Sequence, residues 1–315
     1  MKWVKKIWIL IFLVLAIGMQ GMGNLEIKTS DGTLHGTLAK AEGHPGEVIV
    51  LIAGSGPTDR NGNSLVLSGR MDSFLQLSRA LNKEGYSVFR YDKRTAGKSR
   101  DSFGKEKAIF DQEINFDDFV EDAILVVETM REIGYKKVHL IGHSQGALLA
   151  LRVAQTGLVD SLVHLSGPGV PIDQVFLRQL ESLPKDLYKE AEQAFKKMRK
   201  GEDIGVVSQE LEPYFSDQTI PFLLNWMQYD PVEEAILVDV PLYFVGGDAD
   251  TQVLGSNLKI FEEKIPGAQS KLIPNMNHVL KRVESERENQ QSYQDPSYPL
   301  DPILVESITG FLNRT

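Results

Sequence analysis

The sequence predicts an α/β fold built on a mostly parallel sheet, with helices on both faces and one helical insertion. Two observations lead to this prediction. From Asn24 onward, short runs of branched apolar residues alternate with longer segments in which apolar residues recur every three or four positions. This alternation stops once, over residues 168–240, where the helical pattern continues without a strand. The 315 residues therefore fit one large domain that is interrupted by an insertion.

The strands are expected where branched and aromatic residues cluster between turn residues. The first two strands join across Asp31 and Gly32 as a hairpin, because an Asp-Gly pair between apolar runs favours a tight turn. Asp301 and Pro302 mark the start of the last helix, as its N-cap and first helical residue. The expected strands are residues 25–29, 33–39, 47–53, 87–91, 137–141, 161–165, 242–245 and 271–273. The expected helices are residues 71–82, 116–133, 145–155, 254–264 and 302–312.

The insertion, residues 168–240, divides the expected core into residues 24–167 and 241–315. Its apolar residues have the three- and four-residue spacing of amphipathic helices. We expect these helices to form a cap over the core. Their apolar side chains, together with Trp226, either pack within the cap or line a substrate pocket. The apolar stripes are Ile172, Phe176, Leu180 and Leu183, then Leu187, Ala191, Phe195 and Met198.

Residues 1–23 differ from the rest of the chain. Lys2, Lys5 and Lys6 precede an unbroken apolar run over residues 7–17, a pattern typical of a secretory signal. The run is too short for a helix that spans a bilayer, which needs about 20 apolar residues. We therefore expect export to the periplasm or out of the cell. The alternative is an uncleaved signal, which would anchor the protein and be its only contact with a membrane.

The composition excludes several classes of protein and site. The chain has no cysteine, which excludes disulfide scaffolds, thiolate metal sites and a cysteine nucleophile. Its 34 lysines and arginines against 43 aspartates and glutamates give a formal net charge of -9, the wrong sign for binding a phosphate backbone. No pair of histidines has the spacing typical of a metal site. We therefore expect no nucleic-acid partner, no metal and no cofactor; the oligomeric state is not predicted.

The most informative motif is Gly142-His143-Ser144-Gln145-Gly146. It follows an expected buried strand and precedes an expected helix, so the G-x-S-x-G pattern stands in the setting of a nucleophile elbow. A serine on such a sharp turn has a strained backbone, and glycine on either side leaves room for the chain to pass. The helix behind the serine adds the positive end of its dipole. Ser144 is therefore the expected nucleophile.

A serine hydroxyl needs a general base, and the base needs a group that fixes its tautomer. In this setting the triad residues follow the chain order serine, acid, histidine. His278, in the loop after the last expected strand, satisfies this order, and we expect it to be the base. The remaining histidines lie in the first hairpin, the next loop, the elbow and two strands: His35, His44, His143, His139 and His164.

The acid is expected after the preceding strand, where Asp248 and Asp250 both lie. From the residues alone, both aspartates remain candidates for the acid. With its elbow and its order of triad residues, the chain resembles the α/β-hydrolases, in which the acid commonly appears in the pattern Gly-x-x-Asp-x-x-Val. Gly247, Asp250 and Val253 match this spacing. The resemblance therefore implies Asp250 as the acid, and Asp248 would hold the loop.

The oxyanion formed during acyl transfer needs two backbone N–H donors. One comes from Gln145, directly after the nucleophile, and the other from the loop after the third strand. That loop contains Gly54, Ser55 and Gly56, and its glycines allow the backbone to come close to an acyl oxygen. We expect Ser55 N–H to be the second donor, or the N–H of Gly54 or Gly56 if the register shifts by one residue.

Further candidates for contact with the substrate are Gly54, Gly56, Arg60 and His143. Arg60 lies beside the expected oxyanion loop. It either binds an anionic group of the substrate or ties neighbouring loops together through the charges around it.

The loop around Ser55 resembles a group of bacterial esterase-like hydrolases related to serine aminopeptidases and lysophospholipases. The similarity extends from about Ala53 to Phe311 and includes residues 90–94 and 295–302. This resemblance implies a serine hydrolase that cleaves small carboxylic esters through an acyl-serine intermediate. A peptidase, amidase or thioesterase is the alternative, because such enzymes share the triad and differ in the pocket. A non-catalytic binding protein of this fold would be expected to lack a triad residue.

Overall fold

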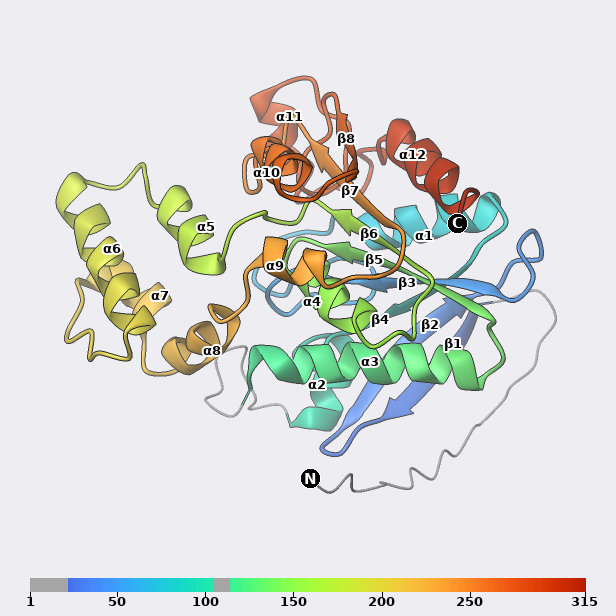
Figure 1. The fold of residues 1–315 in the computed structure, drawn as a ribbon, viewed down its shortest axis with the longest axis horizontal. Coiled ribbons are helices and arrows are strands. Elements are labelled where there is room, and N and C mark those ends of the chain that lie inside the picture. The colour runs from blue at the N-terminus through green and yellow to red at the C-terminus, as the bar shows by residue number, and fades with distance from the viewer. Residues whose placement is uncertain (1–21, 105–113) are drawn as a thin grey trace.

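The structure, a computed structural model, describes residues 22–104 and 114–315. Within this part of the chain, the strands form an 8-stranded sheet with the order β1-β2-β4-β3-β5-β6-β7-β8 (Figure 1). Strand β2 pairs antiparallel with β1 and β4, and the other neighbours are parallel. The strands are β1 (Met22–Lys28), β2 (Thr33–Ala39), β3 (Glu47–Ile52), β4 (Ser87–Tyr91), β5 (Lys137–His143), β6 (Ser161–Leu165), β7 (Leu242–Gly247) and β8 (Gln269–Ile273). The predicted fold class, a mostly parallel sheet between helices, is confirmed.

Each strand and helix expected from the sequence is present. The largest change at a strand end is in β1, which starts at Met22 because its backbone pairs with Ala39 at the end of β2. Two helices were not expected: α2 (Gly97–Phe103) and α11 (Glu286–Gln291). Both are short and mostly polar, so they carry no apolar repeat of helical period.

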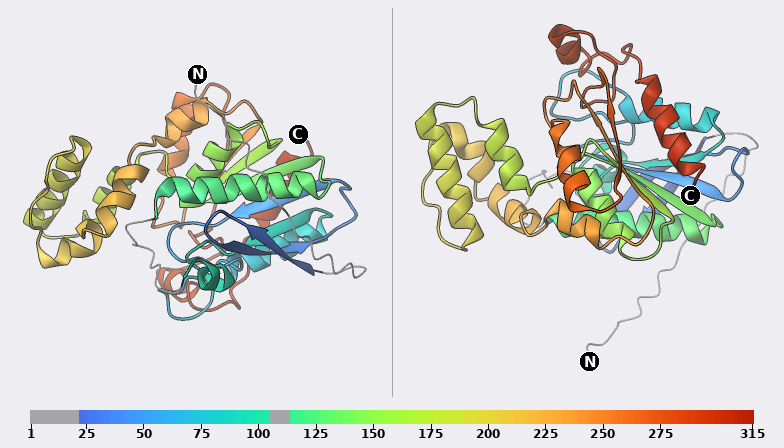
Figure 2. Two further views of the ribbon diagram at one scale, coloured as in Figure 1. Left: turned by 90° about the horizontal axis from the view of Figure 1, so that it is seen from below. Right: turned by 45° about the horizontal axis from the view of Figure 1, so that its top comes forward.

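Alternate residues of the central strands face opposite layers of helices. In β3, Val48, Val50 and Ile52 pack into one core with α3, α4 and α10, whereas Ile49 and Leu51 pack into the other with α1 and α12. Figure 2 shows these two layers on either side of the sheet. Because both faces of β3 are covered, its sequence is apolar throughout rather than alternating. These helices are α1 (Ser73–Lys83), α3 (Phe116–Glu132), α4 (Gln145–Ala154), α10 (Ser256–Lys264) and α12 (Pro302–Leu312).

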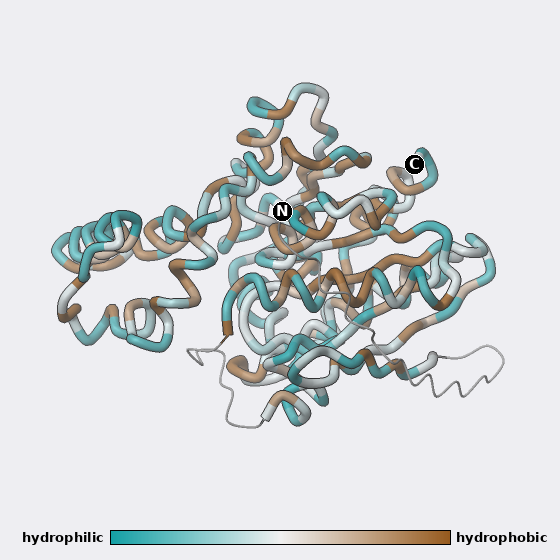
Figure 3. The backbone as a smooth tube through the Cα atoms, turned by 60° about the horizontal axis from the view of Figure 1, so that its bottom comes forward, coloured by the Kyte–Doolittle hydropathy of each residue, from teal (hydrophilic) through white to brown (hydrophobic). Residues whose placement is uncertain are grey.

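The segment between β6 and β7 is helical and extends away from the sheet (Figures 1 and 2). Its apolar residues pack on one another: the ring of Phe176 lies 6.3 Å from that of Phe195 and 6.5 Å from that of Trp226. Figure 3 shows hydrophobic stretches alternating with hydrophilic ones along these helices. We call this segment the helical insertion. Its helices are α5 (Ile172–Gln179), α6 (Lys185–Arg199), α7 (Glu212–Phe215), α8 (Thr219–Trp226) and α9 (Pro231–Ile236).

The expected export signal, residues 1–23, lies outside the described residues except for its last two, which belong to β1. Across residues 22–104 and 114–315, no helix combines the length and apolar character that crossing a bilayer requires. The uncleaved-anchor alternative concerns residues that the structure does not describe.

Candidate active site

Ser144 lies on the sharp turn between β5 and α4, and its backbone has the unusual angles φ 55 and ψ -122. The flanking glycines are required by close approach of the chain. A Cβ at Gly142 would lie 2.2 Å from the Gly146 carbonyl oxygen, and one at Gly146 would lie 2.2 Å from the Ile52 carbonyl oxygen. The strain at Ser144 is held in place because its N–H donates to Leu165 O on β6 at 3.0 Å.

His278 and Asp250 come from two loops at the carboxyl ends of β8 and β7. The Nδ1–H of His278 donates to Asp250 Oδ2 at 2.8 Å, and both side chains are buried. The other oxygen of Asp250 accepts from the N–H groups of Gln252 (2.9 Å) and Val253 (2.8 Å), which fixes the carboxylate. In the part of the chain that the structure describes, Ser144 Oγ forms no hydrogen bond.

Asp248, the other candidate acid, points elsewhere. Its Oδ1 accepts the N–H of Asn275 at 2.6 Å and so supports the turn that leads into the histidine loop. Asn275 has φ 62, a left-handed conformation that asparagine tolerates better than most residues. The geometry therefore pairs Asp250 with the imidazole and gives Asp248 the loop-holding position.

A buried network of uncharged groups holds the histidine loop. The amide nitrogen of Asn277 donates to Asn289 Oδ1 at 3.0 Å and to Ser292 Oγ at 2.7 Å, while its oxygen accepts the Lys281 N–H at 3.0 Å. Asn289 in turn donates to the carbonyl of Ala249, beside Asp250, at 3.0 Å. The network therefore joins the histidine loop to the acid loop. No sequence motif pointed to it.

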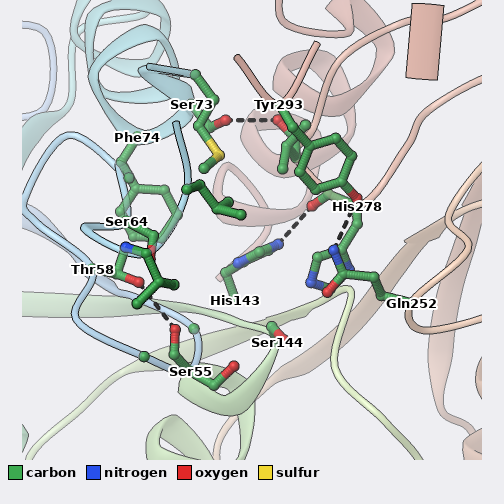
Figure 4. Close-up of a pocket in the computed structure, with 17 residues that line it drawn as sticks. Ser55, Thr58, Ser64, Ser73, Phe74, His143, Ser144, Gln252, His278 and Tyr293 are labelled. Carbon is green, nitrogen blue, oxygen red and sulfur yellow. Dashed lines mark hydrogen bonds between the residues drawn. The ribbon is translucent and has the colours of Figure 1, made fainter. Parts of the chain in front are cut away.

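His143, the variable residue of the elbow, lies against His278. Its Nε2–H donates to the backbone oxygen of His278 at 2.8 Å, and the two ring centroids are 4.8 Å apart (Figure 4). Burial, and then the proximity of His278, lowers the pKa of His143 to about 3. The ring is therefore neutral at ordinary pH. It lines the cavity, and its hydrogen bond also holds the backbone of the loop that carries His278; its contact with a substrate stays a prediction.

The loop after β3 passes close to Ser144. A Cβ added to Gly54 would lie 3.1 Å from Ser144 Cβ, so this glycine keeps the loop near the nucleophile. Gly56 has φ +78, a conformation that strains other residues. Within the described residues, the Ser55 N–H donates to no backbone or side-chain acceptor. Gln145 is the first residue of α4, so its N–H has no partner within the helix.

Arg60 does not reach the cavities that the site opens into. Its Nε and Nη2 donate to the two oxygens of Asp92 at 3.0 and 2.6 Å, and its Nη1 donates to Thr37 Oγ1 at 3.0 Å. All three nitrogens are thus directed at protein groups. The expectation that Arg60 binds an anionic substrate is not supported, and the loop-tying alternative explains its geometry. The sequence could not show this ion pair, because Arg60 lies in the loop after β3 whereas Asp92 follows β4, 32 positions away.

Two cavities meet at the loop of Ser55 and Gly56. The first, of about 300 Å³, is lined by Ser144, His143 and His278 (Figure 4). The second, of about 350 Å³, lies between the sheet and the helical insertion. Its walls are mainly apolar and aromatic, and they include Phe119, Phe176, Tyr214, Phe222, Leu223 and Trp226. Part of the apolar stripe of the insertion therefore lines a pocket as well as packing internally.

Among the polar residues of the cavities that the sequence did not identify as site residues are Tyr293 and Lys93. Tyr293 accepts a hydrogen bond from Gln252 Nε2 at 3.0 Å, and burial, with Asp250 nearby, raises its pKa. Lys93 is buried in the wall of the second cavity. A lysine two residues after a fully buried strand was the available signal for it. Across residues 22–104 and 114–315, no group of three or more histidine, aspartate or glutamate side chains is arranged to hold a metal ion.

Comparison with known families supports the fold around the elbow. Residues 61–200 match the family described as alpha/beta hydrolase fold, a stretch that contains the elbow, and the sheet order around the elbow agrees with that fold. The chain has the α/β-hydrolase fold, and over this stretch its sequence is similar to that family. The matched stretch ends before Asp250 and His278, so those two residues are assigned from the geometry described above.

The chain is also similar to individual proteins of known name or structure. The chain is 25% identical to esterase EstD of Thermotoga maritima over 253 residues, which are 78% of this chain and 57% of that protein. It thus spans just over half the length of that relative. Among solved structures, Est1E from Butyrivibrio proteoclasticus with bound ferulic acid gives a TM-score of 0.59 at 17% identity, covering 92% of this chain and 98% of the other. An esterase from Pyrococcus furiosus gives 0.57 at 19% identity, covering 93% and 91%. These two similarities concern the fold.

Proposed function

We propose that the protein hydrolyses carboxylic esters of small molecules through an acyl-serine intermediate. The observation that carries this proposal is the His278–Asp250 hydrogen bond of 2.8 Å in the wall of the cavity onto which Ser144 opens. The similarity to EstD, which is named an esterase, supports the same reaction class.

In the first half-reaction, Ser144 Oγ attacks the acyl carbon while His278 Nε2 takes the hydroxyl proton. Asp250 accepts the Nδ1–H, so that Nε2 carries the free lone pair, and it stabilises the imidazolium that forms. The tetrahedral intermediate collapses when the C–O bond to the alcohol breaks. His278 gives its proton to the departing alkoxide, which leaves as the alcohol.

In the second half-reaction, a water molecule takes the place of the alcohol. His278 removes a proton from the water as its oxygen attacks the acyl carbon, and the same proton then passes to Ser144 Oγ as the acyl-enzyme bond breaks. In both halves the negative charge on the carbonyl oxygen is stabilised by the N–H groups of Ser55 and Gln145. The products are the carboxylic acid and the free serine.

The two cavities suggest how an ester would lie. The first surrounds the reacting groups, and the second, with its aromatic lining, suits an apolar part of the substrate. We propose that the helical insertion acts as a cap that supplies this lining. Exchange of Trp226 for alanine should then raise KM for esters with bulky apolar groups more than for acetate esters.

A substrate panel tests the proposal. Purified protein is assayed with esters, anilides and thioesters of matched acyl groups, beside the Ser144→Ala variant. Faster turnover of esters that disappears in the variant supports the proposal. Faster turnover of anilides or thioesters would instead identify a peptidase, amidase or thioesterase. No turnover of any of them would favour a binding protein of this fold.

We further propose that residues 1–23 direct export of the chain. The support is the sequence alone: the lysines and the apolar run that follows them. Mass spectrometry of the protein recovered from the expressing cell would show the mature N-terminus. A chain that retains Met1 and stays in the membrane fraction would point to the uncleaved anchor.

A further inference from the structure

Lys93 is a buried cation next to the oxyanion loop. It lies two residues after the end of β4, and the residue is 2% exposed. The ammonium donates to the Gly54 carbonyl oxygen at 2.8 Å and to Gln145 Oε1 at 2.8 Å. It also lies 4.3 Å from the ring centre of Phe119, a cation–π arrangement that suits a desolvated ammonium. Because lysine has only donors, both contacts have a fixed direction.

The contact with Gly54 acts on the N–H of Ser55. The Gly54 carbonyl and the Ser55 N–H are the two ends of one peptide group, which is planar and trans. They therefore point in opposite directions from the same rigid plane. By holding the carbonyl, Lys93 sets the direction in which the Ser55 N–H points. A positive charge on the carbonyl also polarises the amide and makes the N–H a stronger donor.

The contact with Gln145 reaches the other expected donor. Gln145 follows Ser144 and starts α4, and its side chain is 3% exposed. Its carboxamide oxygen is directed at Lys93, so the side chain ties the first turn of α4 to the loop of Gly54. The same ammonium therefore contacts the residue that carries one donor and the peptide group that carries the other.

We propose that Lys93 is a positioning residue of the oxyanion hole, which fixes the spacing and direction of the Ser55 and Gln145 N–H groups. This inference rests on the proposed function. Lys93 itself does not touch the reacting atoms. Its effect on the reaction is transmitted through the two amides that would bind the oxyanion, so it should matter more for the transition state than for the bound ester.

The position of Lys93 gives the oxyanion hole a dependence on pH. Burial lowers the pKa of Lys93 to about 7, against the opposing effect of the Asp122 carboxylate on α3. Asp122 is itself paired with Arg94 at 2.8 Å, and the side chains of Gln145 and Phe119, which also contact Lys93, are uncharged. Since the group is cationic below its pKa, raising the pH through about 7 removes the charge. Turnover should fall over the same range.

The test compares wild type with Lys93→Met in kcat, KM and affinity for phenylboronic acid, each measured from pH 5.5 to 9. Boronic acids form a tetrahedral adduct with serine whose oxygen mimics the oxyanion. We expect kcat and boronate affinity to fall by about 10- to 100-fold. This loss is at most as large as the loss in kcat when a direct oxyanion donor is removed. KM should change by less than about twofold, and the decline in kcat near pH 7 should disappear.

The control is Lys281→Met. Lys281 is also buried, donates to the Tyr298 carbonyl at 3.0 Å, and has a pKa lowered by burial to about 8. This variant should keep the decline near pH 7. If Lys93→Met does not fold, Gln145→Met, which removes one contact and keeps the backbone N–H, should give a smaller loss of boronate affinity.

Several outcomes would overturn the inference. A folded Lys93→Met with wild-type kcat and boronate affinity would do so, as would loss of the decline in Lys281→Met alone. A rise in KM confined to anionic esters would make Lys93 a substrate anchor instead. If the wild type neither hydrolyses esters nor binds the boronate, the proposed function itself fails and the inference falls with it.

Discussion

The two sides of the candidate site are held by different chemistry. On the histidine side, Asn277, Asn289 and Ser292 form a buried network without a formal charge, and it joins the histidine loop to the acid loop. On the oxyanion side, the ammonium of Lys93 bridges the loop after β3 and the start of α4. One side depends on uncharged amides and hydroxyls, the other on a single cation.

This difference has a consequence for pH. Amide and hydroxyl groups keep their hydrogen bonds across the range in which proteins are stable, whereas the lowered pKa of Lys93, about 7, makes its contacts sensitive to proton concentration. We therefore expect the fall in kcat at high pH to be caused by deprotonation of Lys93 on the oxyanion side. On the histidine side, His278 has to be neutral to accept the serine proton.

Replacement of the nucleophile should have the largest effect, since it removes the group that both sides serve. Ser144→Ala is expected to lower kcat by about six orders of magnitude, as in comparable triads. Steady-state turnover of a chromogenic ester measures this loss, with circular dichroism as the control for folding. Residual activity within tenfold of wild type would exclude Ser144 as the nucleophile.

The acid on the histidine side should have the next largest effect. Asp250→Asn keeps the size of the side chain but favours the wrong imidazole tautomer, so kcat should fall by about four orders of magnitude. Asp248→Asn is the matched control, because the Asp248 carboxylate accepts the Asn275 N–H and, within the described residues, makes no hydrogen bond to the imidazole. Its kcat should stay within about tenfold of wild type. The reverse order of the two effects would reassign the acid.

The uncharged network can be broken without touching a charged group. Asn277→Ala removes an amide with partners on Asn289 and Ser292, and leaves these buried groups unsatisfied. The free energy of unfolding should fall by about 2 kcal/mol, and kcat by about tenfold as the histidine loop loosens. Chemical denaturation and pH profiles check both. If the decline in kcat near pH 7 changed in this variant, the pH dependence would not belong to the oxyanion side alone, and the contrast between the two sides would be wrong.

Replacement of Arg60 should have the smallest effect on catalysis. Arg60→Met leaves the mostly buried Asp92 without its partner, so the free energy of unfolding should fall by about 3 kcal/mol. The ratio of kcat/KM for acidic and neutral esters should stay the same, because the guanidinium faces Asp92 and Thr37 rather than a cavity. A selective loss for acidic esters would restore Arg60 as a substrate contact.

The sequence predicted the features that local patterns encode. The strands could be recognised because the central ones are covered on both faces and are apolar throughout. Ser144 could be recognised because the glycines that the sharp turn requires lie within the same five consecutive residues. Asp250 needed the family resemblance, since Asp248 has the same chemistry two positions away.

The remaining features depend on contacts between distant parts of the chain. The partners of Lys93 are 39 and 52 positions away, and the partner of Arg60 is 32 positions away. No periodicity or motif links such residues. For this reason the sequence left Arg60 open between a substrate contact and a tie between loops, where the structure has an internal ion pair, and it gave Lys93 no role.

Labelling with a fluorophosphonate tests the central claim most directly. The reagent reacts with a serine only when a base and an oxyanion hole activate it. The wild-type protein is treated, digested and mapped by mass spectrometry, with heat-denatured protein as the control. We predict one adduct, on the peptide that contains Ser144, and none after denaturation. No adduct in the folded protein, or an adduct on another serine, would contradict the claim that Ser144 is the catalytic nucleophile.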